Sequence, residues 1–167
     1  MSKVTDDLKA AFAGESQASR KYNSFARKAD QDGFPQIAKL FRAAAQAETH
    51  HAYNHLKAMG GINSTAENLQ AAIAGESYEV ESMYPEFIQE AEAEGVKKAV
   101  NTFRWAMEVE KGHEELYRKA LQAAEKGEDA PQVEYYVCPF CGYTHEGPME
   151  GACPVCGTPG EKFELIQ

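Results

Sequence analysis

One segment of this chain occurs twice, and this internal repeat is the feature that most limits the folds available to it. The stretch Ala13-Gly14-Glu15-Ser16 recurs 61 positions later as Ala74-Gly75-Glu76-Ser77. Chance similarity between two Ala- and Glu-rich stretches would match scattered Ala and Glu, not residues of many types in one order. After one inserted residue the offset becomes 62, and the matching pairs are Tyr22/Tyr84, Phe25/Phe87, Gly33/Gly95, Phe41/Phe103, Arg42/Arg104, Glu48/Glu110 and His51/His113. The chain therefore carries one structural unit in two copies.

Helix-forming residues fill both copies, and turn residues divide each copy in two. The chain before about residue 127 is rich in Ala, Glu, Lys and Gln, which favour helix. Asp32-Gly33, Gly60-Gly61 and Gly95 are typical of helix ends, and Ser64 or Thr65 could cap the helix that follows. The pattern predicts two helical hairpins, with four helices at roughly 6–30, 35–59, 65–94 and 96–126.

Each copy carries a lone glutamate on its first helix and a Glu-x-x-His pair on its second. The lone residues are Glu15 and Glu76, and the pairs are Glu48 with His51 and Glu110 with His113. Residues three apart on a helix share one face, and two such pairs facing two lone glutamates are the ligands of ferritin-like di-iron and di-manganese proteins. A solvated helix face would explain one pair, but not two at equivalent repeat positions. Buried together, these groups require cations, so a carboxylate-bridged two-metal site is predicted.

Three further residues lie on the same helix faces. Glu79 follows Glu76 by one turn, where the first copy has Ala18, and it could be a seventh ligand or a surface glutamate. Tyr22 and Tyr84 lie two turns beyond the lone glutamates. They could donate hydrogen bonds to ligand carboxylates, or they could be ordinary core tyrosines.

The four cysteines form two matching turns near the end of the chain, Cys138-Pro-Phe-Cys141-Gly and Cys153-Pro-Val-Cys156-Gly. Two Cys-x-x-Cys turns are typical of a tetrahedral four-sulfur site for zinc or iron. A disulfide network would require an oxidising compartment, which nothing in the sequence indicates. The spacing alone does not choose between the two metals.

Composition changes near residue 127, where helix formers give way to Gly, Pro, Tyr and Cys. The predicted domains are a helical bundle at 1–127, a linker at 128–134 and a small metal-stapled domain at 135–167. The net charge of −9 argues against nucleic acid and anionic membranes as partners. No segment approaches the ~20 apolar residues of a membrane span, and the first residues lack an apolar signal core. We therefore expect a cytoplasmic protein.

A helical bundle with these ligands, followed by two Cys-Pro-x-Cys-Gly turns, resembles rubrerythrin over essentially the whole chain. The motifs that carry the resemblance are Gly14-Glu15-Ser16-Gln17, Glu48-x-x-His51, Glu76-x-x-Glu79, Glu110-x-x-His113 and both cysteine turns. The resemblance implies an all-α ferritin-like four-helix bundle followed by a small rubredoxin-like β domain. It also implies a carboxylate-bridged pair of irons and one iron on the four cysteines. The implied ligands of the iron pair are Glu15, Glu48, His51, Glu76, Glu79, Glu110 and His113.

The same resemblance implies a peroxidase that reduces hydrogen peroxide to water in oxidative-stress defence. Its electrons would pass through the four-cysteine iron and come from a rubredoxin or an NAD(P)H-dependent reductase. On reduction, one iron would exchange the carboxylate of Glu79 for the imidazole of His51, and Tyr22 or Tyr84 would help to manage protons. The alternatives are a ferroxidase or iron-handling protein, since ferritin-like sites also oxidise ferrous iron, and a binding module with zinc in both sites.

The connector between the second and third helices is short for a ferritin-like bundle, in which it must run back along the bundle. The gap from about residue 59 to a helix capped near residue 64 would be roughly 28 Å at 1.5 Å per helical residue. Four or five extended residues reach only ~16 Å. Either residues 60–70 are more extended than their composition suggests, or the hairpins exchange between two chains. We expect a homodimer, with domain swapping as one of these two possibilities.

Overall fold

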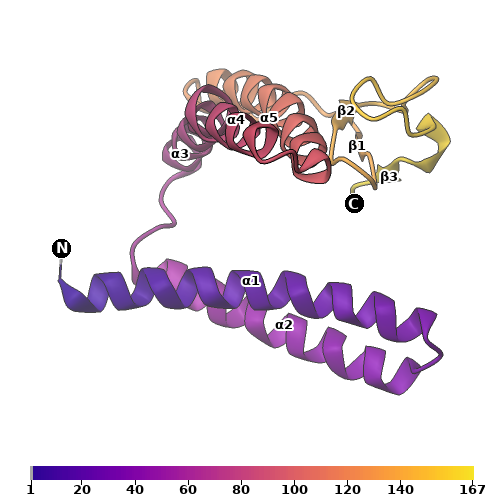
Figure 1. The fold of residues 1–167 in the computed structure, drawn as a ribbon. Coiled ribbons are helices and arrows are strands. Elements are labelled where there is room, and N and C mark those ends of the chain that lie inside the picture. Colours follow the sequence, from indigo (N-terminus) through magenta and orange to yellow (C-terminus); the bar gives the residue numbers. More distant parts are fainter. Residues whose placement is uncertain (1) are drawn as a thin grey trace. The chain divides into compact units, whose positions relative to one another are not determined.

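The computed structural model describes residues 2–167, which divide into two compact units at residues 63 and 64. In the first unit, helices α1 (Lys3–Gln31) and α2 (Pro35–Ala58) run antiparallel, side by side (Figure 1). Gly33 ends α1 with a φ of 81°, a conformation that favours glycine. The N–H groups of Gly33 and Phe34 donate to the carbonyls of Asp30 and Ala29, which satisfies the last carbonyls of the helix.

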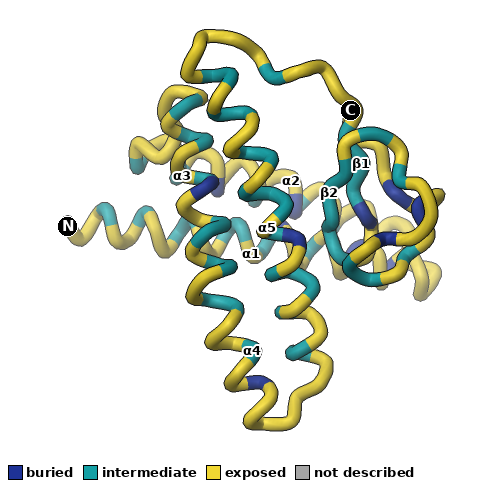
Figure 2. The backbone as a smooth tube through the Cα atoms, turned by 90° about the horizontal axis from the view of Figure 1, so that it is seen from above, coloured by how far each residue is buried: buried dark blue, intermediate teal, exposed yellow. Residues whose placement is uncertain are grey.

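The contact between α1 and α2 is lined by small residues. Within residues 2–63, the buried side chains are those of alanines and one serine, and Ala26, Ala29 and Ala38 form a cluster with Phe41. Figure 2, coloured by burial, shows few buried positions along α1. Small residues allow two helices to approach closely, but a helix pair can bury only the stripe between its members. Larger apolar side chains such as Ile37 and Leu40 are exposed on this unit.

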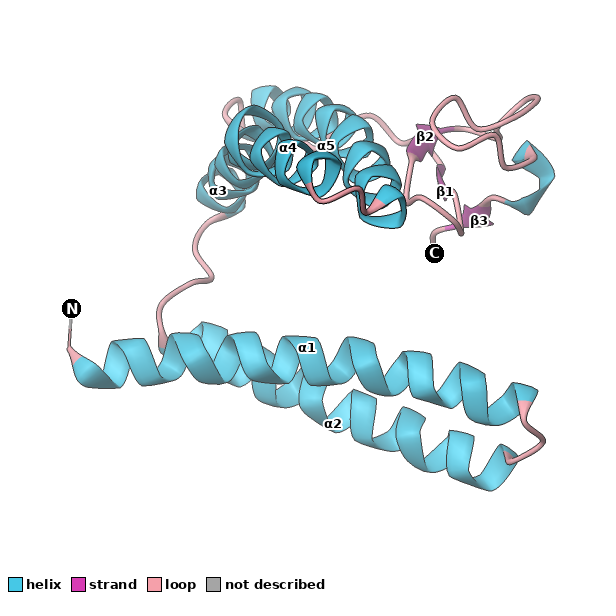
Figure 3. Cartoon of the chain, in the orientation of Figure 1, coloured by secondary structure: helices cyan, strands magenta, loops and turns pink. Residues whose placement is uncertain are grey.

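The second unit begins with the third predicted helix, which starts at a capping box. The Ser64 hydroxyl accepts a hydrogen bond from the N–H of Glu67, and the Glu67 carboxylate accepts one from the N–H of Ser64. Ser64 rather than Thr65 is therefore the N-cap, and the reciprocal bonds satisfy two free backbone donors. The helical segment continues as α3 (Thr65–Tyr78), a π-helical turn (Glu79–Met83) and α4 (Tyr84–Ala93). It packs on α5 (Lys97–Ala124) (Figure 3).

The π-helical turn accounts for the residue that the second copy of the repeat inserts. A π turn accommodates one additional residue without ending the helix, and such turns are common at functional sites. The turn begins at Glu79, two residues after Ser77, the last residue of the stretch that recurs at the offset of 61. The offset between the copies therefore changes from 61 to 62 inside a continuous helix.

Contacts in the two hairpins repeat along with the residues. The rings of Phe25 and Phe41 have centroids 5.6 Å apart, and those of Phe87 and Phe103 are separated by the same distance. Each second helix also forms an ion pair with the first helix of its hairpin, Arg42 with Asp30 at 2.7 Å and Arg104 with Glu92 at 2.5 Å. The two copies are thus the same hairpin in three dimensions.

The end of the chain forms a three-stranded antiparallel sheet in the order β2-β1-β3. The strands are β1 (Tyr135–Val137), β2 (Thr144–Glu146) and β3 (Glu164–Leu165). The core beside this sheet consists of Cys138, Cys153 and Phe163, with partly buried aromatic and aliphatic side chains around them. A segment of fewer than about 40 residues rarely folds on an apolar core alone, so a metal on the cysteines would stabilise this one.

The small sheet packs against α5 of its own chain. The rings of Trp105 and Phe140 meet edge to face with centroids 5.0 Å apart, and Lys119 Nζ lies 3.9 Å from Glu146 Oε2. These contacts lie within the second unit, so they place the cysteine turns close to the helix that carries Glu110. None of the described helices combines the length and the apolar character needed to cross a membrane.

Gly160 is the glycine whose replacement should most affect the small domain. A Cβ atom at this position would lie inside contact distance of the Met149 carbonyl oxygen and 2.9 Å from that of Gly151. Both atoms belong to backbone, which cannot move away cheaply. Gly160→Ala is expected to lower the free energy of unfolding of residues 135–167 by about 1–3 kcal/mol or more. Urea denaturation of the iron-loaded protein measures this, with the visible absorbance of the four-cysteine site as the signal.

Gly112→Ala on α5 is the matched control for this substitution. A Cβ at Gly112 meets no neighbouring atom among the described residues within 4 Å, and alanine favours helix by about 1 kcal/mol. This variant should be as stable as the parent or more so. Equal denaturation midpoints for the parent and Gly160→Ala would contradict the packing argument.

Candidate metal centres

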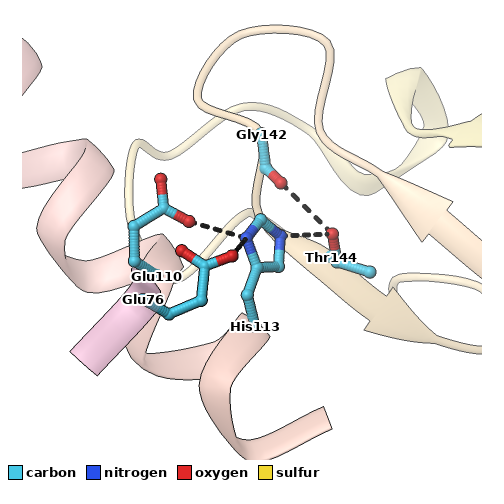
Figure 4. Close-up of polar contacts among 5 residues, drawn as sticks. All are labelled: Glu76, Glu110, His113, Gly142 and Thr144. Carbon is cyan, nitrogen blue, oxygen red and sulfur yellow. Dashed lines mark hydrogen bonds and ion pairs between the residues drawn. The ribbon is translucent and has the colours of Figure 1, made fainter. Parts of the chain in front are cut away.

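The second hairpin brings three predicted ligands together. Glu76 comes from α3, and Glu110 and His113 lie one turn apart on α5, because residues three apart share a helix face. His113 Nδ1 lies 2.6 Å from Glu110 Oε2 and 4.0 Å from Glu76 Oε1 (Figure 4). The two carboxylate side chains are each 18% exposed and the imidazole is 26% exposed. One donor atom from each residue lies within 4.8 Å of the others.

The negative charges of the carboxylates in this cluster repel one another. Burial, together with the charges of Glu110 and Glu79, raises the pKa of Glu76. Burial and the charge of Glu110 likewise raise the pKa of Glu79. The hydrogen bond to the Glu110 carboxylate raises the pKa of His113 in spite of its burial. Crowded negative charge of this kind favours a cation at its centre.

Glu79 and Tyr84 lie beside this cluster, at the two ends of the π-helical turn. Tyr84 donates a hydrogen bond to the Glu79 carboxylate, and burial with the negative charge of Glu79 raises the pKa of the tyrosine. Glu79 lies close enough to Glu110 for the charge of Glu110 to raise the pKa of Glu79, so Glu79 is near the three clustered residues. Its role as a seventh ligand stays a prediction.

The first hairpin repeats the arrangement with Glu15 on α1 and with Glu48 and His51 on α2. Donor atoms of the three residues lie within 4.8 Å of one another, and His51 Nδ1 is 2.7 Å from Glu48 Oε2. The His51 side chain is 54% exposed, about twice as much as that of His113. Tyr22 makes ring contacts with Phe25 and Phe41, and its role towards the carboxylates stays a prediction.

Six of the predicted ligands thus form two clusters of identical composition, one on each hairpin, each called a half-site below. Each offers two carboxylates and one imidazole, a donor set that suits iron, manganese or zinc. Three protein ligands leave coordination positions open on a metal ion.

The four cysteines converge on a single point in the small domain. The sulfur atoms of Cys138 and Cys156 lie 3.6 Å apart, as do those of Cys141 and Cys153. A disulfide bond would require about 2.05 Å, whereas a tetrahedral metal with bonds of about 2.3 Å places its sulfur ligands about 3.8 Å apart. The geometry therefore fits a metal, and the four thiols are free.

Backbone geometry shapes both cysteine turns in the same way. The N–H groups of Gly142 and Gly157 donate to the carbonyls of Cys138 and Cys153 at 3.0 and 2.9 Å, and both glycines have positive φ. Burial opposes ionisation of Cys138, but backbone N–H groups of Cys141 and Phe140 outweigh it and lower the pKa of that thiol to about 6. Burial raises the pKa of the neighbouring Cys141 thiol, so a cation is needed to hold all four as thiolates.

Two residues near the second half-site were not expected from the sequence. Tyr117 packs its ring near that of His113, and it could have been found, because it lies on the same face of α5 four residues later. The hydroxyl of Thr144 lies 3.0 Å from His113 Nε2. No spacing rule connects Thr144 with His113, because the contact depends on how the small sheet packs on α5.

Comparisons with known protein families agree with both parts of this arrangement. Residues 6–121 match the family described as Rubrerythrin, and residues 136–164 match the family described as Rubrerythrin, rubredoxin-like domain. The first match includes the predicted carboxylate and histidine ligands, and the second includes the four cysteines. The domain limits 1–127, 128–134 and 135–167 stay a prediction.

Individual relatives are similar over nearly the whole chain. Rubrerythrin-2 of Clostridium acetobutylicum is 34% identical, over 98% of this chain and 96% of its own length. Rubrerythrin of Porphyromonas gingivalis is 38% identical, over 99% and 91%. Among solved structures, fully reduced nigerythrin with all irons ferrous is 35% identical and has a TM-score of 0.58, covering 99% of this chain and 88% of that one.

Proposed function

The chain belongs to the rubrerythrin family, and from this premise we propose that it is a non-haem di-iron peroxidase that reduces hydrogen peroxide to water. Its fold class is that of the family, a four-helix bundle followed by a small three-stranded sheet with a four-cysteine cluster. The observation that carries the proposal is the presence of two carboxylate–imidazole clusters and one four-sulfur cluster in a single chain. The former suits reaction with an oxidant, and the latter suits transfer of single electrons.

Reduction of hydrogen peroxide consumes two electrons and two protons and yields two molecules of water. When bound, the pair of irons supplies the two electrons, one from each ion. The chain holds the pair through its glutamates and histidines, whose negative charge offsets that of the metals. The Tyr84 hydroxyl, hydrogen-bonded to the Glu79 carboxylate, is in a position to hold a proton beside the site and to orient that carboxylate.

The four cysteines would hold a third iron, a group that can supply electrons one at a time. Packing of the small sheet on α5 through Trp105 and Phe140 supports this role, because it keeps the sulfur ligands near the helix of Glu110 and His113. An external rubredoxin or NAD(P)H-dependent reductase would supply electrons to this iron. We propose that the protein acts in the cytoplasm as a defence against oxidative stress.

We further propose a homodimer in which each di-iron site combines α1 and α2 of one chain with α3 to α5 of its partner. Ferritin-like bundles have one long crossover connection, which makes α2 and α3 parallel. The ligands Glu48 and His51 lie about 13 Å before the end of α2, and Glu76 lies about 17 Å after the start of α3, at 1.5 Å per residue. A crossover within one chain must therefore span about 30 Å.

The connector is too short for that span. Helix α2 ends at Ala58 and α3 begins at Thr65, and seven fully extended steps reach only about 25 Å. Gly60 and Gly61 donate hydrogen bonds back to the last turn of α2, which shortens the reach further. Exchange of hairpins between two chains removes this requirement, and it would also cover the apolar side chains that are exposed on the first hairpin.

Rapid kinetics tests the proposed activity. The fully iron-loaded protein is reduced under anaerobic conditions. One sample is then mixed with anaerobic hydrogen peroxide and another with dioxygen, while the ferric four-thiolate colour is recorded. Peroxide is expected to restore the colour more than about tenfold faster than dioxygen, a difference of about 1.4 kcal/mol in activation free energy. Equal rates with the two oxidants would count against a peroxidase.

Two further measurements separate the main alternatives. Accumulation of added ferrous iron as a mineral core, without rapid oxidation by peroxide, would indicate an iron-handling protein. A colourless protein that contains zinc in every site would indicate a binding module. Metal analysis of the protein as purified distinguishes these outcomes before any kinetic measurement.

A further inference from the structure

The two ring nitrogens of His113 face different parts of the molecule. Nδ1 points to the carboxylates, 2.6 Å from Glu110 Oε2, whereas Nε2 points to the small domain, 3.0 Å from Thr144 Oγ1 (Figure 4). Thr144 is the first residue of β2. Its hydroxyl donates in turn to the carbonyl oxygen of Gly142 at 3.3 Å, and Gly142 directly follows Cys141. A short chain of hydrogen bonds therefore joins a cysteine turn to the carboxylate half-site.

The placement of the two ring nitrogens indicates which of them carries a proton when a metal is bound. A threonine hydroxyl has one hydrogen to donate and lone pairs to accept with. Nδ1 is the nitrogen on the side of Glu110 and Glu76, where a metal would bind. A neutral imidazole that binds a metal through Nδ1 carries its proton on Nε2, which then donates to the Thr144 oxygen while the threonine hydroxyl donates to Gly142. The hydrogen bond on one ring nitrogen generally sets the tautomer at the other.

Other contacts between the small domain and α5 help to hold Thr144 in this place. The rings of Trp105 on α5 and Phe140 in the first cysteine turn meet edge to face. Gly142, two residues before Thr144, also lies close to α5. A Cβ atom at Gly142 would be 4.0 Å from Cγ1 of Val109, a buried residue of α5. His51, the counterpart of His113 in the first hairpin, makes the same Nδ1 contact with Glu48 but lies in the unit without the small sheet.

We propose that Thr144 is a positioning residue that holds His113 with Nε2 protonated and Nδ1 turned to the metal, and that links the cysteine turn to this half-site within one chain. The proposal deepens the proposed function and rests on it for the identity of the metal site. It adds a residue outside both ligand sets. It also distinguishes the two histidines, since the sheet anchors His113 and leaves His51 without this bond among the described residues.

Three variants of the full chain test the proposal. Thr144→Val removes the hydroxyl and keeps the shape, Thr144→Ser keeps the hydroxyl, and Thr102→Val is the matched control. Thr102 is an exposed residue of α5 whose hydroxyl bonds only to its own helix backbone among the described residues. The first readout is ¹⁵N NMR of each protein with zinc in all sites, which measures exchange of the His113 Nε2 proton with water.

The parent, Thr144→Ser and Thr102→Val are expected to show slow exchange of that proton. Thr144→Val should show exchange about fivefold faster or more, the factor that corresponds to one lost hydrogen bond of about 1 kcal/mol. A purely structural role would not be rescued selectively by serine. An unchanged exchange rate in Thr144→Val, or equal acceleration in Thr102→Val, would overturn the proposal.

The second readout is oxidation of the four-cysteine iron after the reduced, iron-loaded protein is mixed with peroxide. Thr144→Val should slow the return of the ferric colour by about 10-fold or more, the range in which hydrogen-bond partners of ligating histidines act. Thr144→Ser should restore the rate. A normal rate in Thr144→Val would overturn the proposed link between the sites. If peroxide oxidises no variant, including the parent, the proposed function fails, while the NMR result still decides the role of Thr144.

Discussion

Alanine at Glu48 or at Glu110 is expected to lower the rate of peroxide reduction by more than about 100-fold. Removal of a hydrogen-bond partner of a metal ligand already costs about 10- to 100-fold, and each of these substitutions removes a predicted ligand itself. The two half-sites are symmetric in composition, so the losses should be similar. Steady-state turnover with peroxide and an excess of reductant measures both.

A mixture of these two inactive variants should regain activity if the hairpins exchange. Glu48→Ala damages α2 and leaves α3 to α5 intact, whereas Glu110→Ala does the reverse. In a swapped heterodimer, one site combines the two intact hairpins and the other combines the two damaged ones. Unfolding and refolding an equimolar mixture with iron yields about half heterodimers, so about a quarter of the parent activity should return.

The control for this experiment is a mixture of Glu15→Ala with Glu48→Ala. Both substitutions lie in the first hairpin, so every di-iron site in a swapped heterodimer contains one of them, and no activity should return. Size-exclusion chromatography of each mixture verifies that dimers have formed. A mixture of Glu48→Ala with Glu110→Ala that forms dimers but stays inactive would show that each site is built from one chain.

Serine at Cys153 is expected to unfold the small domain while the helices persist. Cys153 is one of the three buried residues at the centre of that domain, and the rest of its apolar core is too small to fold alone. Structural metal binding contributes about 10–16 kcal/mol to domains of this kind. The iron-loaded variant should lose the ferric four-thiolate colour, and a protease should rapidly remove residues 135–167.

Ala152→Ser is the matched control, because it places the same side chain on the exposed neighbouring residue. It should keep both the colour and the protease resistance. Far-ultraviolet circular dichroism should hardly change in either variant, since the described α-helices lie before residue 125. A Cys153→Ser protein with a protease-resistant small domain would show that apolar packing is sufficient there.

Local residue patterns predicted much of this fold because the physics that they encode is local. Turns at Gly33 and Gly95 require positive φ, and both adopt it. Spacing of three residues placed Glu110 beside His113 on one helix face, as observed. The insertion between the two copies was visible as a change of offset, but a sequence cannot say whether an extra residue forms a loop or a π turn. That choice depends on whether the helix can stay continuous against α5.

The sequence by itself determined the two hairpins, the residues of both carboxylate clusters and the four-sulfur cluster, because helical periodicity and short cysteine turns bring those atoms together within a few residues or one repeated unit. Only the tertiary structure decided that the small sheet packs on α5 and that Thr144 meets Nε2 of His113. That contact joins residues 31 apart through the packing of Trp105 and Phe140, and the energy of such packing depends on shape complementarity that no spacing rule contains.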